Sequence, residues 1–272
     1  MLKARSVLLT GALSLAVTLG ASAQGQRGGG GGQRGAGPPA PPAAAKAAAP
    51  VDLTGNWVSI VTEDWLNRMI TPPKGNRASA PGLTPAGNEI FNTWDPAKDQ
   101  TAGEACRAYG AAGIMRVPGR LRITWADDNT LKIETDAGTQ TRLIHFGVSR
   151  PPEGESRSWQ GYSIGTWELS AGARGGRGGA AAAPPAPAWG TLKVVTTNLR
   201  MGYLRPNGFP YSENAIVTEY FDRHADFGAE WFTVTTTVDD PTFLAQNFLT
   251  SSSFRKEPDG SKFNPGPCEV TR

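Results

Sequence analysis

Arginine and glutamate residues on strand-like segments are the first candidates for chemistry in this chain of 272 residues. Arg142, Glu168 and Glu219 each lie where polar and apolar residues alternate. Glu219 shares its face with Val217 and Phe221, so it is a carboxylate in an apolar set. Such a group must be paired, hydrogen-bonded or shifted in pKa. The pattern predicts a polar cluster inside a barrel; the alternatives are a structural ion pair or residues that face water.

Histidine and tryptophan extend this candidate set. His145 follows Arg142 on the same strand-like segment but on its other face, and one of the two faces would line a lumen. Trp167 is one of eight tryptophans, and a few of these lining a cavity would suit a small apolar or carbohydrate ligand. The candidate ligand-binding residues are therefore Arg142, His145, Glu168, Glu219 and Trp167, and no catalytic residue is assigned.

The sequence does not contain a catalytic or binding motif in the structural context that the motif requires. Gly161-Tyr162-Ser163-Ile164-Gly165 has the spacing of a hydrolase Gly-x-Ser-x-Gly motif, but it lies inside a strand pattern and not at a strand–turn–helix junction. The Gly-rich tracts lack the Gly-Lys-Ser/Thr ending of a phosphate loop. Two histidines without His-x-His or Cys-x-x-Cys do not form a zinc site, so neither a metal nor another cofactor is expected.

The two cysteines, Cys106 and Cys268, are expected to pair. Two is the number that can form one disulfide in an oxidising compartment. The bridge would close a loop of about 160 residues and hold the C-terminal tail. The alternative is a pair of buried free thiols.

Segments with a period of two supply the elements that would position these side chains. About nine of them, rich in β-branched and aromatic residues, are expected to be strands: 53–61, 121–125, 131–135, 139–146, 159–169, 190–199, 214–223, 230–239 and 248–256. Turn-forming sequences such as Asp127-Asp128-Asn129 and Pro206-Asn207-Gly208 separate them. Residues 85–94 form the one expected helix, with Thr84 as its N-cap and Pro85 at its first position.

The number and order of these segments predict an all-β protein, built as an antiparallel meander. A closed or nearly closed barrel of about 8–10 strands is favoured because closure removes unpaired strand edges. A β-sandwich of two sheets is the alternative. Roughly 200 ordered residues fit one domain of this kind.

The first 23 residues have the three zones of a signal peptide. Lys3 and Arg5 precede an apolar run over residues 7–19, and Ala21-Ser22-Ala23 supplies the small residues of a cleavage site. A membrane-spanning helix is the alternative, but it needs roughly 20 apolar residues. Export to the periplasm or the medium is therefore expected, with no membrane span in the remaining chain.

Two low-complexity segments define the rest of the domain organisation. Residues 24–50, rich in Gly, Pro and Ala, are expected to be a disordered tether. Residues 51–272 would form a single β domain. The tract 171–188 interrupts it and is expected to be a disordered loop insertion; a domain boundary is the alternative.

The charge balance excludes nucleic acid as a partner. Five of the 27 basic residues precede residue 51, whereas all 24 acidic residues follow it. From residue 51 on, 22 basic residues meet 24 acidic ones, so the folded part is nearly neutral. The oligomeric state is left open.

Two resemblances to known families add to this interpretation. Leu53-Thr54-Gly55-Asn56-Trp57 contains the Gly-x-Trp that opens many lipocalin-like (calycin) barrels. Gly161-Tyr162-Ser163-Ile164-Gly165-Thr166-Trp167-Glu168 resembles the G-x-S-I-G-x-W-E segment of a group of secreted bacterial proteins without an established activity. Thr218-Glu219-Tyr220-Phe221-Asp222-Arg223 is similar to the T-E-Y-F-x-R segment of the same group. The resemblance covers residues 142–255 and implies export and a β fold, but no reaction. The D-G-R that the group carries after its arginine strand is absent here.

Three functions follow as hypotheses. The first is an exported protein of lipocalin-like build that binds a small, apolar ligand. The second is a secreted hydrolase or isomerase that uses a Glu/Arg/His set in the barrel lumen. The third is a structural protein of the envelope. A ligand-sized cavity would favour the first, converging ionisable groups in a cavity the second, and a filled barrel the third.

Overall fold

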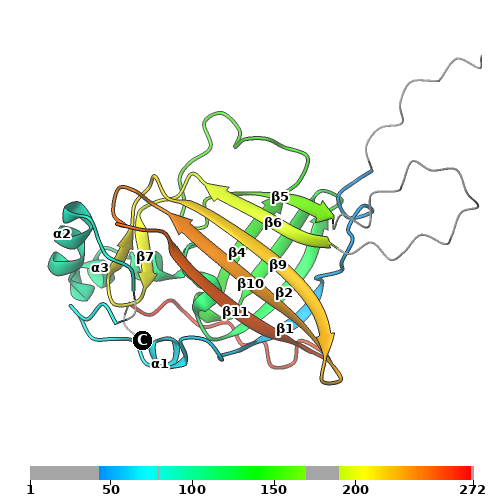
Figure 1. Ribbon diagram of the computed structural model, residues 1–272, viewed down its shortest axis with the longest axis horizontal. Coiled ribbons are helices and arrows are strands. Elements are labelled where there is room, and N and C mark those ends of the chain that lie inside the picture. Colours follow the sequence, from blue (N-terminus) through cyan, green and yellow to red (C-terminus); the bar gives the residue numbers. More distant parts are fainter. Residues whose placement is uncertain (1–42, 79, 170–189, 271–272) are drawn as a thin grey trace, which may run out of the picture. The chain divides into compact units, whose positions relative to one another are not determined.

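A computed structural model describes residues 43–78, 80–169 and 190–270 of the chain. The signal-like residues 1–23 and the loop insertion 171–188 lie outside these ranges. Nine strands form a closed barrel in the order β1-β11-β10-β9-β6-β5-β4-β3-β2 (Figure 1). Their bounds are β1 Gly55–Ile60, β2 Arg120–Asp127, β3 Thr130–Thr135, β4 Gln140–His145, β5 Tyr162–Leu169, β6 Gly190–Thr197, β9 Ile216–Asp226, β10 Ala229–Asp239 and β11 Phe248–Glu257. The all-β barrel is confirmed, and the sandwich is excluded.

One pair of neighbouring strands runs parallel. β4 and β5 pair with Ile144 opposite Ser163 and His145 opposite Ile164, whereas the other neighbours in the barrel are antiparallel. Parallel neighbours cannot be joined by a tight turn, so the chain crosses from the end of β4 to the start of β5 through residues 146–161. The predicted antiparallel meander is therefore interrupted at this one pair of strands.

Inward-facing aromatic side chains fill part of the lumen. Trp57, Phe221, Phe232 and Phe254 come from four strands and are buried. Their rings pack with centroid separations of 4.7 to 6.1 Å. Trp57, the tryptophan of the Gly-x-Trp motif, donates its indole N–H to the carbonyl of Leu53 at 3.0 Å. This region of the barrel therefore holds protein side chains where a ligand was expected.

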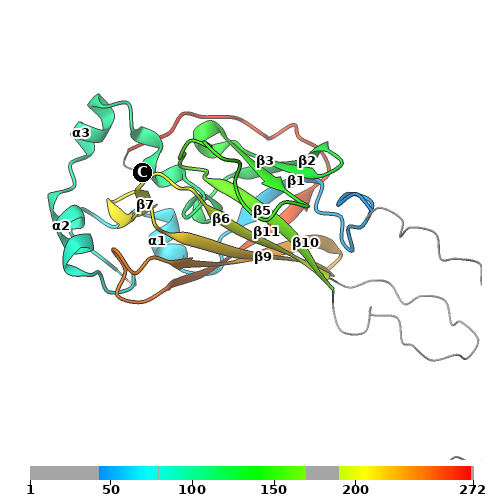
Figure 2. The ribbon, with the colours of Figure 1, turned by 90° about the horizontal axis from the view of Figure 1, so that it is seen from above.

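Short elements gather at one end of the barrel (Figure 2). They are α2 (Pro85–Thr93), α3 (Pro96–Thr101) and a hairpin of β7 (Gly202–Arg205) and β8 (Phe209–Tyr211). α2 is the expected helix: the Thr84 hydroxyl accepts a hydrogen bond from the Gly87 N–H at 3.1 Å, and Pro85 is its first residue. The sequence did not predict the hairpin, α1 (Trp65–Met69), α3, or the 3₁₀ turns η1 (Ala105–Tyr109), η2 (Ile114–Arg116) and η3 (Ala137–Thr139).

Residues 43–54 lie at the opposite end of the barrel (Figures 1 and 2). The Ala45 N–H donates to Asn129 Oδ1 at 2.9 Å, and the Lys46 N–H donates to the Asp128 carbonyl at 3.0 Å. The last residues of the expected tether are thus attached to the β2–β3 turn.

The disulfide between Cys106 and Cys268 is confirmed, and it spans 162 residues of sequence. It joins η1 to the segment that follows β11, where the Gly266 N–H also donates to the Asp136 carbonyl at 2.8 Å. The C-terminal segment is therefore held against the barrel. Within the described ranges, no helix has the length and apolar character needed to cross a membrane.

Candidate ligand-binding site

Arg142 and Glu219 meet inside the barrel. Arg142 Nη2 lies 2.5 Å from Glu219 Oε2, and the side chains are 3% and 0% exposed. Arg142 also donates from Nε to Ser163 Oγ at 3.0 Å and from Nη2 to Thr196 Oγ1 at 2.7 Å. The two hydroxyl oxygens are 2.7 Å apart. Four strands, β4, β5, β6 and β9, thus each contribute one polar group, because each group occupies an inward position of its strand.

Apolar neighbours enclose this polar cluster. Along β9, the inward residues on either side of Glu219 are Val217 and Phe221, and along β4 the inward residue after Arg142 is Ile144; each is 0% exposed. Burial of the charges is tolerated because they are paired and hydrogen-bonded. The geometry supports a structural ion pair, since a ligand in solvent cannot reach either charged group.

His145 and Glu168 do not join the cluster. His145 lies on the outer face of β4, and its ring stacks on Tyr162 with centroids 4.6 Å apart. The side chain of Glu168 is 48% exposed and pairs with Lys193 Nζ at 3.4 Å. The predicted grouping of Glu168 with Arg142 and Glu219 is therefore corrected. On β5, the side chains of Ser163 and of every second residue after it point into the barrel. Glu168 occupies one of the intervening positions, so its side chain points outward.

A hollow of about 570 Å³ on the outer face of the barrel includes Glu168, but its charged side chains already have partners in the protein. Lys193 lies over the ring of Tyr220 as well as beside Glu168, and Thr191 hydrogen-bonds Asp222. This surface is a network of exposed pairs, which leaves Trp167 as the candidate that faces a pocket with an aromatic lining.

Trp167 lies at the end of the barrel that residues 43–54 cover. It occupies an inward position of β5, and its indole N–H donates to the Ala45 carbonyl at 2.9 Å. Phe146 packs against two tryptophans: its ring stacks on Trp167 with centroids 5.3 Å apart, and its centroid is 5.6 Å from that of Trp125 in a tilted arrangement. Three rings from β2, β5 and the residue after β4 therefore form one aromatic surface.

A pocket of about 300 Å³ adjoins this surface. Trp125, Trp167 and Leu131 come from the barrel, and the segment before β1 provides the other lining residues: Lys46, Ala49, Val51, Asp52, Leu53 and Thr54. The pocket thus has aromatic and aliphatic walls together with one basic and one acidic side chain. Below we call it the Trp125–Trp167 pocket.

The acidic group of this pocket is held as a carboxylate. Partial burial opposes ionisation of Asp52, but hydrogen bonds from the Thr54 hydroxyl and N–H, at 2.7 and 2.9 Å, favour the charged form. The charges of Arg223 and Lys256 act in the same direction, so the pKa of the Asp52 carboxyl is below its usual range. Asp52 can therefore accept hydrogen bonds from a ligand but does not supply a proton.

A second polar group that the sequence did not reveal links α3, η1 and β7. Asp99 accepts hydrogen bonds at 2.9 Å from three donors: Trp94 Nε1, Arg107 Nη1 and the Tyr203 hydroxyl. Burial and the hydrogen bond to Asp99, against the opposing effect of Arg107, raise the pKa of Tyr203 to about 12. Because Asp99 is surrounded by donors from its own chain, the group serves to fix these elements.

Sequence comparison does not add a functional assignment. No protein-family model, no curated protein and no solved structure matches the chain. Across residues 43–78, 80–169 and 190–270, no three His, Cys, Asp or Glu side chains converge as a metal site would require. The Trp125–Trp167 pocket, with its aromatic wall and two charged side chains, is the candidate ligand site.

Proposed function

We propose that the protein is an exported small-ligand-binding protein and that the ligand occupies the Trp125–Trp167 pocket. One observation carries the proposal: two tryptophans of the barrel line a pocket of about 300 Å³ that also contains a lysine and a carboxylate. Ligand sites are typically concave and mostly apolar, with a few polar groups that orient the ligand. The ligand site is thus at the end of the barrel and not deep in its lumen.

The volume and lining indicate the class of ligand. Pockets for small molecules begin at roughly 300 Å³, so a ligand with one or two rings fits. The aromatic surface favours an apolar ring or the apolar face of a sugar, and Lys46 and Asp52 are placed to hydrogen-bond polar atoms at its edge. We favour a small, mainly apolar ligand, with a single sugar ring as the variant that the same groups would accept.

Export accords with the disulfide and with the signal-like start of the sequence. A disulfide such as Cys106–Cys268 persists in oxidising compartments, which include the periplasm and the extracellular medium. The lipocalin-like description remains part of the proposal: a closed barrel with a buried Gly-x-Trp tryptophan is compatible with it.

The two other hypotheses differ in what supports them. A hydrolase or isomerase would need a Glu/Arg/His set that reaches a ligand, but Arg142 and Glu219 are enclosed and His145 faces outward. A structural envelope protein has one observation in its favour, the aromatic side chains that fill the lumen. The binding experiment must therefore separate ligand binding from a purely structural role.

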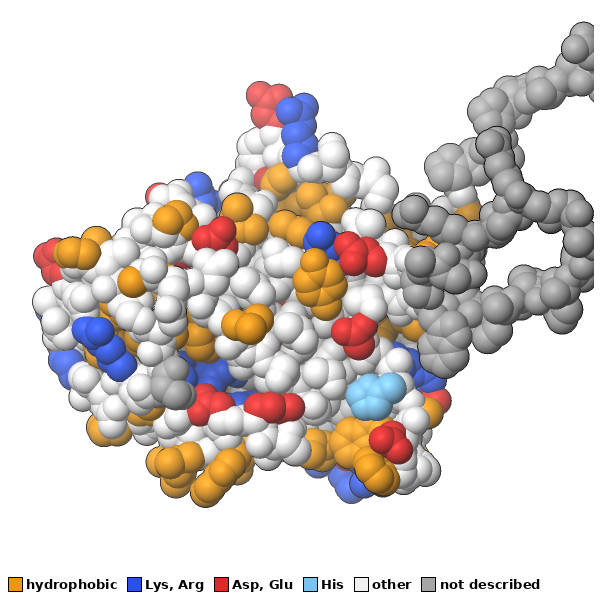
Figure 3. Space-filling model, viewed as in Figure 1, with side chains coloured by type: hydrophobic (Ala, Val, Ile, Leu, Met, Phe, Trp, Pro, Cys, Tyr) orange, Lys and Arg blue, Asp and Glu red, His pale blue; other side chains and the backbone are white. Residues whose placement is uncertain are grey.

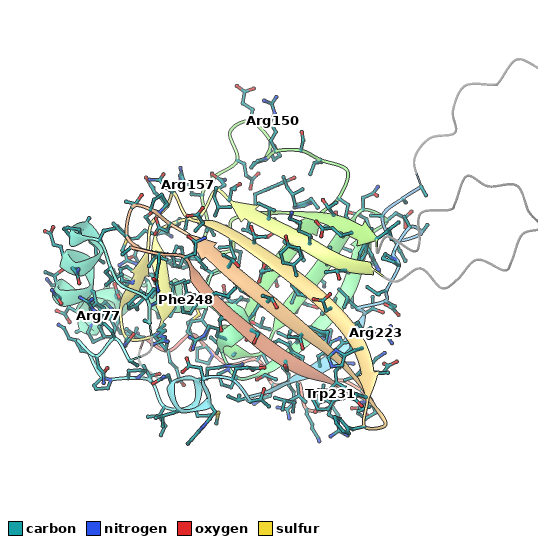
Figure 4. All side chains as sticks on the ribbon, in the orientation of Figure 1. Arg77, Arg150, Arg157, Arg223, Trp231 and Phe248 are labelled. Atoms are coloured by element: carbon teal, nitrogen blue, oxygen red, sulfur yellow. A yellow bond between two sulfur atoms is a disulfide. The ribbon has the colours of Figure 1, made fainter. Side chains whose placement is uncertain are left out.

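Binding is tested by titrating the exported protein with 1-anilinonaphthalene-8-sulfonate, an apolar aromatic probe, and separately with methyl glucoside, while tryptophan fluorescence is recorded. We expect saturable binding of the aromatic probe. Trp167→Ala should weaken binding of the aromatic probe about tenfold. The loss of an aromatic contact worth about 1.4 kcal/mol raises the Kd by that factor. Trp231→Ala is the matched control, since Trp231 lies on the outer face near the β9–β10 hairpin (Figure 4).

Native mass spectrometry of the protein from periplasmic extracts gives an independent readout. A mass increment that is present in the wild type and missing in Trp167→Ala supports the proposal. If neither probe binds saturably and every preparation has the ligand-free mass, the ligand-binding function is refuted and the structural role is favoured.

A further inference from the structure

The short helix α1 presents its apolar side to solvent. Trp65, Leu66 and Met69 lie within about 100° of one another around the helix axis, and Ile70 follows directly after the helix. These four side chains are between 51% and 64% exposed. Figure 3 shows hydrophobic side chains projecting from the surface over α1. Below we call the four side chains the α1 apolar patch.

The polar side of α1 is the side that the rest of the protein covers. Arg68 is buried, and its Nε donates to the Arg116 carbonyl at 2.9 Å. Glu63, just before the helix, accepts a hydrogen bond from Ser253 Oγ on β11 at 3.1 Å. A surface helix normally turns its apolar stripe to the core and its charged residues to water. The orientation of α1 is the reverse, so packing within this chain does not explain the apolar patch.

The exposed charges around the α1 apolar patch in the chain are basic. Between residues 61 and 77, the exposed charged side chains are those of Lys74 and Arg77. The acidic residues of this segment, Glu63 and Asp64, are half-buried, and each pairs with a buried arginine. Basic side chains next to an apolar surface are attracted to anionic lipid headgroups. The segment therefore combines apolar side chains with charges complementary to an anionic membrane surface.

The shape of the α1 apolar patch favours a lipid surface over a second copy of the chain. A symmetric dimer brings the same patch of two copies together, so the projecting side chains would meet an identical projection and not a matching hollow. A lipid surface does not require a complementary shape. Apolar side chains enter the boundary between headgroups and acyl chains to a depth of about 5–10 Å, and tryptophan is typical of that boundary.

We propose that the α1 apolar patch attaches the protein to the surface of a membrane that contains anionic phospholipids. The four apolar side chains enter the headgroup boundary, while Lys74 and Arg77 remain among the headgroups. The attachment is peripheral and reversible, since even a single myristoyl chain gives only reversible binding. The proposal is independent of the Trp125–Trp167 pocket, which lies at the end of the barrel that residues 43–54 cover.

The first test is flotation of the exported protein with vesicles of phosphatidylglycerol and phosphatidylcholine. The wild type should bind, and the double variant Trp65→Ser, Met69→Ser should bind at least about tenfold more weakly, because it removes two of the four apolar side chains. Both side chains are exposed, so the urea midpoint of the variant should not change. Leu143→Ser is the matched control: this leucine is 42% exposed on β4, on the far side of the closed barrel from β11.

The lipid dependence tests the basic side chains separately. Lys74→Gln should weaken binding to the mixed vesicles about fivefold, the factor for one basic residue near an anionic surface. Its binding to vesicles of phosphatidylcholine alone should equal that of the wild type. Equal binding of Lys74→Gln and the wild type to the mixed vesicles would overturn the assignment to anionic lipid.

Lipids with brominated acyl chains, which quench tryptophan fluorescence on contact, locate the attachment. Binding to such vesicles should reduce the fluorescence of the wild type. Trp65→Phe should still bind but lose most of this quenching, because phenylalanine keeps an apolar ring and contributes no tryptophan fluorescence. Unchanged quenching in Trp65→Phe would place another face on the membrane and overturn the proposal. A wild type that does not bind vesicles, or a double serine variant that binds equally well, would also overturn it. A dimer in sedimentation equilibrium that the double variant abolishes, without vesicle binding by the wild type, would assign the patch to a second copy instead.

Discussion

Glu219→Gln tests the buried ion pair inside the barrel directly. Glutamine keeps the shape and an acceptor oxygen of Glu219 but removes its charge, which leaves the Arg142 guanidinium without a counter-charge at 3% exposure. Removing one partner of a buried ion pair costs about 3–5 kcal/mol. The free energy of unfolding of an ordinary domain is about 5–15 kcal/mol, so this loss would be a large fraction of the total.

The assay is equilibrium unfolding in urea, followed by both tryptophan fluorescence and far-ultraviolet circular dichroism. The midpoint should fall while the slope of free energy against urea stays constant, because the surface exposed on unfolding does not change. Glu168→Gln is the matched control on the same barrel. Its carboxylate is 48% exposed and pairs with Lys193, so its loss should cost less than about 1 kcal/mol.

The double variant Arg142→Met, Glu219→Gln separates the cost of an unpaired charge from the cost of altered packing. Once the guanidinium is absent, the glutamine no longer leaves a charge unpaired, so the double loss should be smaller than the sum of the single losses by about 2 kcal/mol or more. If Glu219→Gln lowers the free energy of unfolding no more than Glu168→Gln does, the expected cost of an unpaired buried charge at Arg142 is refuted. If it instead abolishes probe binding at unchanged stability, Glu219 belongs to a ligand site.

Three further predictions concern stability. Reduction of Cys106–Cys268 should lower the free energy of unfolding by up to about 5 kcal/mol, because the bridge spans 162 residues; equal urea midpoints with and without reductant would contradict this. Gly165→Ala should lower the free energy of unfolding by about 1–3 kcal/mol, because its Cβ would lie 2.7 Å from the nearest side-chain carbon. Gly266→Ala is the control, since the space around its Cβ position is open. Equal urea midpoints for the two variants would exclude the clash. The pKa of Tyr203 is raised to about 12, so the unfolded chain loses the tyrosine proton at a lower pH than the folded protein. The free energy of unfolding should therefore fall as pH rises from about 10 to about 12, by at most about 1.4 kcal/mol per pH unit. Tyr203→Phe should flatten that fall in pH-dependent urea unfolding, and an unchanged slope would show that another group causes it.

The strands of the barrel were predictable because each has a buried and an exposed face. On β2 and β3, Leu121, Ile123, Leu131 and Ile133 alternate with polar residues, and all four are buried as that pattern predicts. The parallel pairing of β4 with β5 was not predictable in this way, because alternation does not encode the direction of a neighbouring strand.

The unpredicted elements lack a local signal. β7 and β8 have four and three residues, all buried, so there is no alternation to detect. α1 and α3 have five and six residues, too few to display a helical period. Pro206-Asn207-Gly208 does mark the turn between β7 and β8, but a turn signal alone does not reveal the short strands on its two sides.

The candidate site was predictable in part. The inward position of Glu219 followed from its apolar neighbours, and Arg142 is its partner. Which face of β4 points inward depends on the closed barrel, so the outward position of His145 could not be known. The pocket itself was missed because Lys46 and Ala49 lie in a stretch whose composition indicates disorder, whereas contacts with Asn129 and Trp167 order it.

The position of β1 has a consequence for the order of folding. β1 pairs with β2 on one side and with β11 on the other, where Asn56 lies opposite Glu257. During synthesis the β2–β3 and β3–β4 hairpins can form early, but one edge of β1 stays unpaired until nearly the whole chain has emerged. Contacts of such long sequence separation slow folding and leave an open edge that can pair with other chains. Truncation before β11 should therefore yield an aggregating product and not a smaller barrel.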